Sequence, residues 1–155
     1  MKATRIIRAA NPDHMTALPE TPSLIAFFMM PIEILKDLHN DFGNLIGERL
    51  TNVILFQAGF RSGFGIIKRM EVNCESISML SPSLPSLWIE LGLGLLEVVD
   101  ATRETIVVVC NESKEALAMG QTGKPSCHLT SGYLSGVLSA LLGEHYQCRE
   151  IECLS

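Results

Sequence analysis

Side chains with metal-binding chemistry lie at both ends of the stretch from Cys127 to Ser155. Cys127 and His128 open this stretch. A second group closes it and consists of Cys148, Glu150, Glu152 and Cys153. Thiolates, imidazoles and carboxylates are the side chains that bind zinc in proteins. Cys127 and Cys153 are far apart in the sequence, so they can share a metal ion only if the chain between them folds back. The alternative interpretation is that both are small, buried apolar side chains.

The chain between the two groups predicts a helix followed by a strand. Apolar residues recur at intervals of three and four over Thr130–Leu142, which predicts one apolar helix face. This face consists of Leu134, Val137, Leu138, Leu141 and Leu142. Small residues beside it would let another segment approach closely, and Gly143 is suited to end the helix. We expect a short strand over Tyr146–Cys153.

These motifs resemble the 4-vinyl reductase domain. The resemblance rests on a Cys that opens a helix, Gly-Tyr-Leu-x-Gly at 132–136, a Leu-rich turn that ends in Gly, and a strand that closes with Glu-x-Glu-Cys at 150–153. It covers the chain from Pro31 onward and is specific from Trp88 onward. The resemblance implies a small-molecule-binding module with a fold similar to that of the TRAPP-type vesicle-tethering subunits. It does not imply an activity, because no hydride-cofactor site is recognisable in the sequence.

The resemblance also implies a zinc site. In zinc-containing members, the residues at the positions of Cys127, Glu150 and Cys153 are metal ligands. The family pattern continues to a fourth cysteine ligand beyond Ser155, so we expect either an incomplete C-terminal end or an incomplete site. In a regular strand Glu150 and Cys153 point to opposite faces, so both can bind one metal only if the strand bends or ends near Glu152. His128 is either a substitute ligand or a capping or core histidine. A zinc ion at this place would be structural.

A ligand cavity is expected between the helix Thr130–Leu142 and a preceding hairpin, again from the resemblance. The expected lining residues are Trp88, Val98, Val108, Cys110, Val137, Leu141 and Cys148. In phenol-sensing relatives a His and a Trp hold the ligand hydroxyl, and their positions align with Trp88 and Cys110 here. This difference predicts a cavity that prefers an apolar or larger ring to a phenol. For each of these residues the alternative is ordinary core packing.

Two helices and an arm are expected in the first half of the chain. We expect an N-terminal arm over residues 1–30, in which Ile6–Ile7 begins a short strand and Ser23–Met30 forms an edge strand or packing segment, and one ligand-binding domain over residues 31–155. An amphipathic helix is predicted over Pro31–Ile46, facing either the core or a second copy of the chain. A second helix is predicted over Glu48–Met70. Its inward residues are expected to be Leu50, Val53, Ile54, Phe56 and Phe60, and Gly59, Gly63 and Gly65 indicate close packing or a kink.

The second half of the chain predicts a hairpin between short helices. Pro82 and Pro85 should break any long helix over Glu71–Leu87. Strands are predicted over Leu95–Val99 and Thr105–Cys110, and a short helix over Lys114–Met119. The fold class is therefore α+β, with helices packed on an antiparallel sheet. The histidines His39 and His145 lie in polar surroundings and are expected to face solvent.

The composition limits the functional classes. The chain of 155 residues carries a net charge of −5 and no Lys/Arg cluster longer than a pair, so a nucleic-acid surface on this chain is not expected. Its 47% hydrophobic residues indicate one compact domain. Five cysteines without a recognisable signal peptide favour a cytoplasmic protein with reduced thiols, and no apolar run reaches membrane-spanning length.

Together these features predict a non-catalytic binding module that senses or carries a small hydrophobic or aromatic molecule, as a homodimer with a structural zinc. The first alternative is a structural interaction or dimerisation protein of TRAPP-like type. The second is an enzyme of tetrapyrrole metabolism, for which the spacing shows no Ser-His-Asp constellation. Glu150 and Glu152 are the only pair considered as acid and base, and a solvated edge or a metal role explains them more simply.

Overall fold

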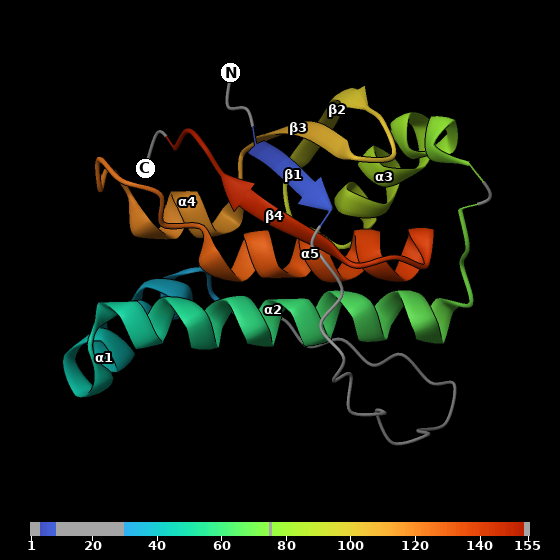
Figure 1. Ribbon diagram of the computed structural model, residues 1–155. Helices are drawn as coiled ribbons and strands as arrows, with labels where there is room; N and C mark the ends of the chain where they lie inside the picture. Colours follow the sequence, from blue (N-terminus) through green and yellow to red (C-terminus); the bar gives the residue numbers. More distant parts are fainter. Residues whose placement is uncertain (1–3, 9–29, 75, 154–155) are drawn as a thin grey trace.

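The computed structural model describes residues 4–8, 30–74 and 76–153 (Figure 1). The elements are β1 (Thr4–Arg8), α1 (Glu33–Ile46), α2 (Glu48–Met70), a 3₁₀ turn (Ile77–Met79), α3 (Leu80–Glu90), β2 (Leu95–Ala101), β3 (Thr105–Asn111), α4 (Lys114–Met119), α5 (His128–Leu142) and β4 (Tyr146–Glu150). The predicted α+β class is confirmed. Most of the expected N-terminal arm, including most of Ser23–Met30, lies outside the described residues.

The four strands form one antiparallel sheet in the order β2-β3-β1-β4. The hairpin β2–β3 agrees with the predicted strands. The short strand expected at Ile6–Ile7 is present as β1, and it lies inside the sheet, where Ile6 is opposite Ile106 on one side and Cys148 on the other. The division of the chain after residue 30 stays a prediction.

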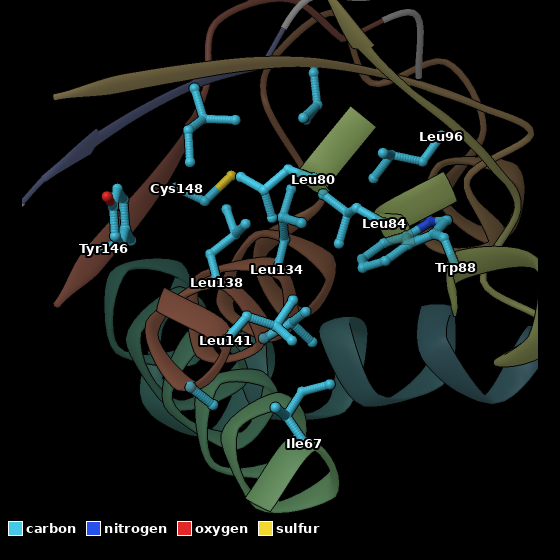
Figure 2. Close-up of a cluster of buried hydrophobic side chains, with 14 of the residues drawn as sticks. Ile67, Leu80, Leu84, Trp88, Leu96, Leu134, Leu138, Leu141, Tyr146 and Cys148 are labelled. Carbon is cyan, nitrogen blue, oxygen red and sulfur yellow. The ribbon is translucent and has the colours of Figure 1, made fainter. Parts of the chain in front are cut away.

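Figure 1 shows three layers, with the sheet above α5 and α5 above the long helix α2. Figure 2 shows the core between the sheet and the helices, with Tyr146 at one end of the cluster and Trp88 at the other. The α3 and α5 side chains of this core are fully or almost fully buried: Leu80, Leu84, Trp88, Leu134, Val137, Leu138 and Leu141. None of the helices in the described parts of the chain is long and apolar enough to cross a membrane.

Glycines bring α2 and α5 into backbone contact. A Cβ atom on Gly63 would lie 2.2 Å from the carbonyl oxygen of Tyr133, and one on Gly132 would lie 2.0 Å from the carbonyl oxygen of Phe56. Gly59 and Gly136 are equally restricted. Real Cβ atoms do not approach this closely, so any larger residue would push the two helices apart. The predicted close packing of this glycine-containing stretch is thus confirmed.

The buried face of α2 differs from the predicted one. Leu50, Val53 and Ile54 were expected to point inward, but they are 49%, 52% and 40% exposed. The face toward α5 carries instead a stripe at four-residue spacing, which includes Thr51, Leu55, Gly59 and Gly63. The prediction was wrong because hydrophobic periodicity favours large apolar residues, whereas this interface is formed by small residues that allow backbone contact.

Helix α3 also differs from the prediction, because it runs through both prolines. Pro82 lies in the first turn, where a helix needs no backbone N–H donor, but Pro85 lies inside the helix. An interior proline costs about 3 kcal/mol. Leu80, Leu84 and Trp88 share one face of α3 and are completely buried, and each contributes about 1.5–3 kcal/mol. Burial of this face therefore outweighs the break that Pro85 would otherwise cause.

Serine hydroxyls of α5 hold the outer edge of β4. The Ser135 hydroxyl accepts a hydrogen bond from the Cys148 backbone N–H at 2.7 Å, and the Ser139 hydroxyl accepts one from the Tyr146 N–H at 2.9 Å. Both serines are buried. An unpaired strand edge leaves its N–H groups open to another strand, so these hydroxyls satisfy donors that a fifth strand would otherwise pair.

Candidate metal and ligand sites

Cys127, Glu150 and Cys153 come together in the structure. One ligand atom from each lies within 4.8 Å of the others, and the Sγ atoms of Cys127 and Cys153 are 3.9 Å apart. Two thiolates that bind one tetrahedral zinc with Zn–S distances of about 2.3 Å are separated by about 3.8 Å. The three side chains therefore fit a zinc ion without a change in the backbone.

The end of β4 and the start of α5 produce this arrangement. The strand was predicted to continue to Cys153, but it ends at Glu150, and the chain then leaves the strand geometry. This meets the requirement that Glu150 and Cys153 escape the alternation of a regular strand. Cys127 is the N-cap residue of α5, and its backbone N–H donates a hydrogen bond to the Glu150 carboxylate at 3.1 Å.

The surroundings of Cys127 oppose a free thiolate. Burial, with a smaller contribution from the charge of Glu150, raises the pKa of the Cys127 thiol far above its usual range. A cation between the three side chains would supply the positive charge that thiolate formation requires here. Within the part of the chain that the structure describes, no fourth His, Cys, Asp or Glu joins the group. His128 lies instead beside His39, at 6.3 Å between ring centroids.

A small cavity of about 30 Å³ adjoins the metal group. Its lining residues are Trp88, Val108, Cys110, Ser113, Cys127, Thr130, Ser131, Leu134, Cys148, Glu150 and Glu152. The structure thus brings together four of the expected ligand-binding residues, namely Trp88, Val108, Cys110 and Cys148. A volume of about 30 Å³ corresponds to about one water molecule. The cavity is therefore too small for an aromatic ring.

The remaining expected ligand-binding residues lie elsewhere. Val137 and Leu141 are buried among the core side chains, and Val98 is half-buried at the edge of the same core. None of the three lines the small cavity. The ligand-binding role assigned to all seven residues stays a prediction.

A much larger pocket, of about 550 Å³, lies between α1, α2, α3, α4 and α5. Its apolar lining residues are Met30, Pro31, Ile32, Ile34, Leu35, Trp88, Leu91, Leu93, Leu129 and Tyr133. Trp88 lines both this pocket and the small cavity, and its ring meets that of Tyr133 edge-on at 5.9 Å between centroids. Sequence analysis did not find this pocket, because its wall is assembled from segments whose apolar residues fit equally well into a filled core.

Two donors at this pocket lack protein partners among the described residues. The buried Trp88 indole N–H makes no hydrogen bond there. The structure also records no hydrogen bond for the Tyr133 hydroxyl, and burial raises the pKa of Tyr133 to about 12. A neutral phenol that keeps its proton is a hydrogen-bond donor, so the pocket offers donor groups to a ligand.

Glu115 of α4 is a second residue that sequence analysis missed. It is 1% exposed, and its carboxylate accepts hydrogen bonds from the N–H groups of Leu129 at 3.0 Å and Thr130 at 2.7 Å. The third bond, at 2.8 Å, joins it to Nε2 of His39. The carboxylate therefore caps α5 and anchors α1. In the sequence it resembles any acidic residue of a short surface helix, and no local pattern distinguishes it.

Both histidines expected to face solvent are in fact covered. The side chain of His39 is 8% exposed because it bonds to Glu115. His145 is half-buried, stacks on Phe60 at 5.7 Å between ring centroids, and its Nδ1 has no hydrogen-bond partner among the described residues. Polar neighbours in the sequence were a poor guide here, because tertiary contacts come from other helices.

Comparison with known proteins identifies the C-terminal part of the chain. The family model of the 4-vinyl reductase domain matches residues 106–155. The expected resemblance is therefore confirmed over this segment, which contains nearly all of β3, then α4, α5, β4 and the group Cys127, Glu150 and Cys153. A search of curated proteins found no match.

Proposed function

Taking the match to the 4-vinyl reductase domain over residues 106–155 as the premise, we propose that this protein is a non-catalytic module that binds a small apolar molecule and senses or carries it. The observation that carries the proposal is the pocket of about 550 Å³. Ligand pockets typically have volumes of about 300–1,000 Å³, apolar walls and a few polar groups. This pocket has all three properties, whereas the small cavity beside the metal group has room for only about one water molecule.

Zinc has a structural role in this proposal. It would join Cys127 at the start of α5 to Glu150 and Cys153 after β4, and so fix the helix relative to the sheet. Glu150 and Cys127 also line the small cavity, and Trp88 separates that cavity from the large pocket. The metal would therefore stiffen the wall on which the pocket is built, without touching the ligand in the pocket.

Helix α1 is the element through which occupancy would be sensed. It contributes Ile34 and Leu35 to the pocket wall, yet none of its residues is fully buried. Its position depends on partly exposed contacts and on the His39–Glu115 hydrogen bond. A ligand that fills the pocket would add contacts to α1 and shift its population toward the closed position, which a partner could read.

A second candidate function, protein interaction through a homodimer, is favoured by a separate observation. The end of α1 and the first half of α2 expose five large apolar side chains, which we call the α1–α2 patch: Leu45, Ile46, Leu50, Val53 and Ile54. Exposed apolar groups gathered on neighbouring elements are typical of interaction surfaces. A second copy of the chain is the partner we propose for this patch, and the two functions are compatible.

The binding function can be tested with the neutral probe decan-1-ol. Trp88 is the single tryptophan and lines the pocket, so its fluorescence reports occupancy. Ser62 is exposed at the pocket, and Ser62→Phe should fill part of it and weaken binding about tenfold. The matched control is Val99→Phe, because Val99 is exposed on β2 and away from the pocket. Equal binding by both variants, or no saturable binding by the wild type, would contradict the proposal.

A further inference from the structure

We propose that the large pocket takes an apolar molecule with a carboxylate head group, and that the Lys114 ammonium binds this head. The inference rests on the proposed function, because it specifies the ligand class of the same pocket. It starts from the polar groups that line an otherwise apolar wall, namely Lys114, Glu115, Thr130 and Tyr133, with Ser62 at the mouth.

Lys114 is the cation of this pocket. It is the first residue of α4 and is half-buried, and among the described residues no hydrogen bond or salt bridge is recorded for its ammonium group. A half-buried ammonium loses part of its hydration, and an anionic ligand would compensate for that loss. The uncompensated positive charge therefore favours a negatively charged ligand group.

The neighbouring carboxylate does not already neutralise Lys114 through a direct contact. Glu115 points its two oxygens at Leu129 N–H, Thr130 N–H and His39 Nε2 instead. Two of these partners are backbone groups at the positive end of the α5 dipole, so the negative charge of Glu115 is balanced within the fold. Lys114 remains available to a ligand although an acidic residue follows it in the sequence.

The other uncommitted groups are also suited to an acceptor. The Tyr133 hydroxyl and the Trp88 indole N–H have no protein acceptor among the described residues, and an indole N–H can only donate. The one carboxylate of the lining is fully engaged. A ligand whose head group is purely an acceptor and negatively charged matches this set, and a carboxylate has both properties.

The rest of the wall defines the body of the ligand. The Met30–Leu35 segment and the α3 end with Leu91 and Leu93 provide apolar surface for an alkyl chain or a ring. Burial of such a chain is favourable by about 0.8 kcal/mol for each CH₂ group. A medium-chain fatty acid or an aromatic acid combines this body with the required head, whereas a neutral phenol or hydrocarbon would leave Lys114 without a partner.

The experiment compares decanoate with decan-1-ol, which have the same chain and differ in the head group. Binding is measured at pH 7 and low salt by calorimetry and by Trp88 fluorescence. Wild-type protein should bind decanoate at least about fivefold more tightly, and salt should reduce this preference, because a half-exposed charge pair is partly screened. Lys114→Met should remove the preference and Lys114→Arg should retain it. Lys36→Met, at an exposed position of α1 away from the pocket, should leave it unchanged.

The outcomes separate the two proposals. If decan-1-ol binds as tightly as decanoate to the wild type, the carboxylate inference is overturned while the proposed binding function stands. If the decanoate preference survives in Lys114→Met, Lys114 is not the group that binds the head, and the inference is again overturned. If neither compound binds in a saturable way, the proposed binding function fails as well. Circular dichroism of each variant shows whether the fold is intact.

Discussion

The carboxylate of Glu115 and the Nε2 atom of His39 are joined by a partly buried hydrogen bond of 2.8 Å that connects α4 to α1. The same carboxylate accepts two backbone N–H groups at the start of α5. The first amides of a helix have no partner inside that helix, and an acidic group placed there is stabilised by the helix dipole. One side chain thus positions the helix that carries the metal group and the helix that covers the ligand pocket.

We expect Glu115→Ala to lower the free energy of unfolding by about 3 kcal/mol, because it leaves two helix amides and the His39 side chain without their acceptor. Glu115→Gln keeps the shape of the side chain and should lower it less. Urea unfolding followed by circular dichroism measures both. Glu104→Ala, in the exposed turn between β2 and β3, is the control and should stay within about 0.5 kcal/mol of wild type. An equally small effect of Glu115→Ala would show that the cap is dispensable.

Ser135→Ala should destabilise the fold by about 1–3 kcal/mol. The substitution removes the acceptor of the Cys148 N–H at a buried strand edge, where no water can replace it. Ser86→Ala is the matched control, because the Ser86 hydroxyl bonds a helix carbonyl on an exposed surface. Thermal unfolding of both variants measures the difference. A result in which the two substitutions have the same effect would argue against a special role of the Ser135–Cys148 bond.

Gly63→Ala and Gly43→Ala should change stability in opposite directions. A Cβ on Gly63 would lie 2.2 Å from a backbone oxygen of α5, so the helices must separate at a cost of about 1–3 kcal/mol or more. A Cβ on Gly43 of α1 has nothing within 4 Å, and there alanine should stabilise the helix by about 0.5–1 kcal/mol. Chemical denaturation measures both. Stabilisation by Gly63→Ala would contradict the close contact of α2 with α5.

Zinc content tests the metal group. Protein purified without chelator should hold about one zinc per subunit, and Cys153→Ser should lose most of it, because one thiolate is replaced by a weak ligand. Cys74→Ser is the control, since Cys74 lies outside the group. Elemental analysis gives the metal content, and chelation should lower the melting temperature of the wild type. Zinc retained at wild-type levels by Cys153→Ser would exclude the proposed ligand set.

The α1–α2 patch predicts the subunit count. Val53→Glu places a charge among the exposed apolar residues and should convert a homodimer into a monomer in light scattering coupled to size-exclusion chromatography. Ile89→Glu introduces the same charge at another exposed apolar position, on α3, and should leave the dimer intact. A monomeric wild type, or dissociation by Ile89→Glu alone, would show that the patch does not form the interface.

Local patterns were sufficient to predict most elements of this protein. Helix α2 has the predicted limits, Ser113 caps α4 through its hydroxyl, and Gly143 ends α5 in the left-handed conformation. Such features depend on residues within one or two turns of each other, so the sequence alone determines them. The motif around Cys127 and Glu150–Cys153 indicated which side chains to compare, and the structure places them together.

Only the tertiary structure decided which surfaces are buried and where a ligand has room. The inward face of α2, the continuity of α3 through Pro85 and the burial of Glu115 all depend on contacts with segments distant in sequence. Hydrophobic periodicity records the size of side chains, but it does not record how closely two backbones approach. The pocket beside Trp88 and Lys114 has the same origin, because a space between five helices is a property of their packing and of no single segment.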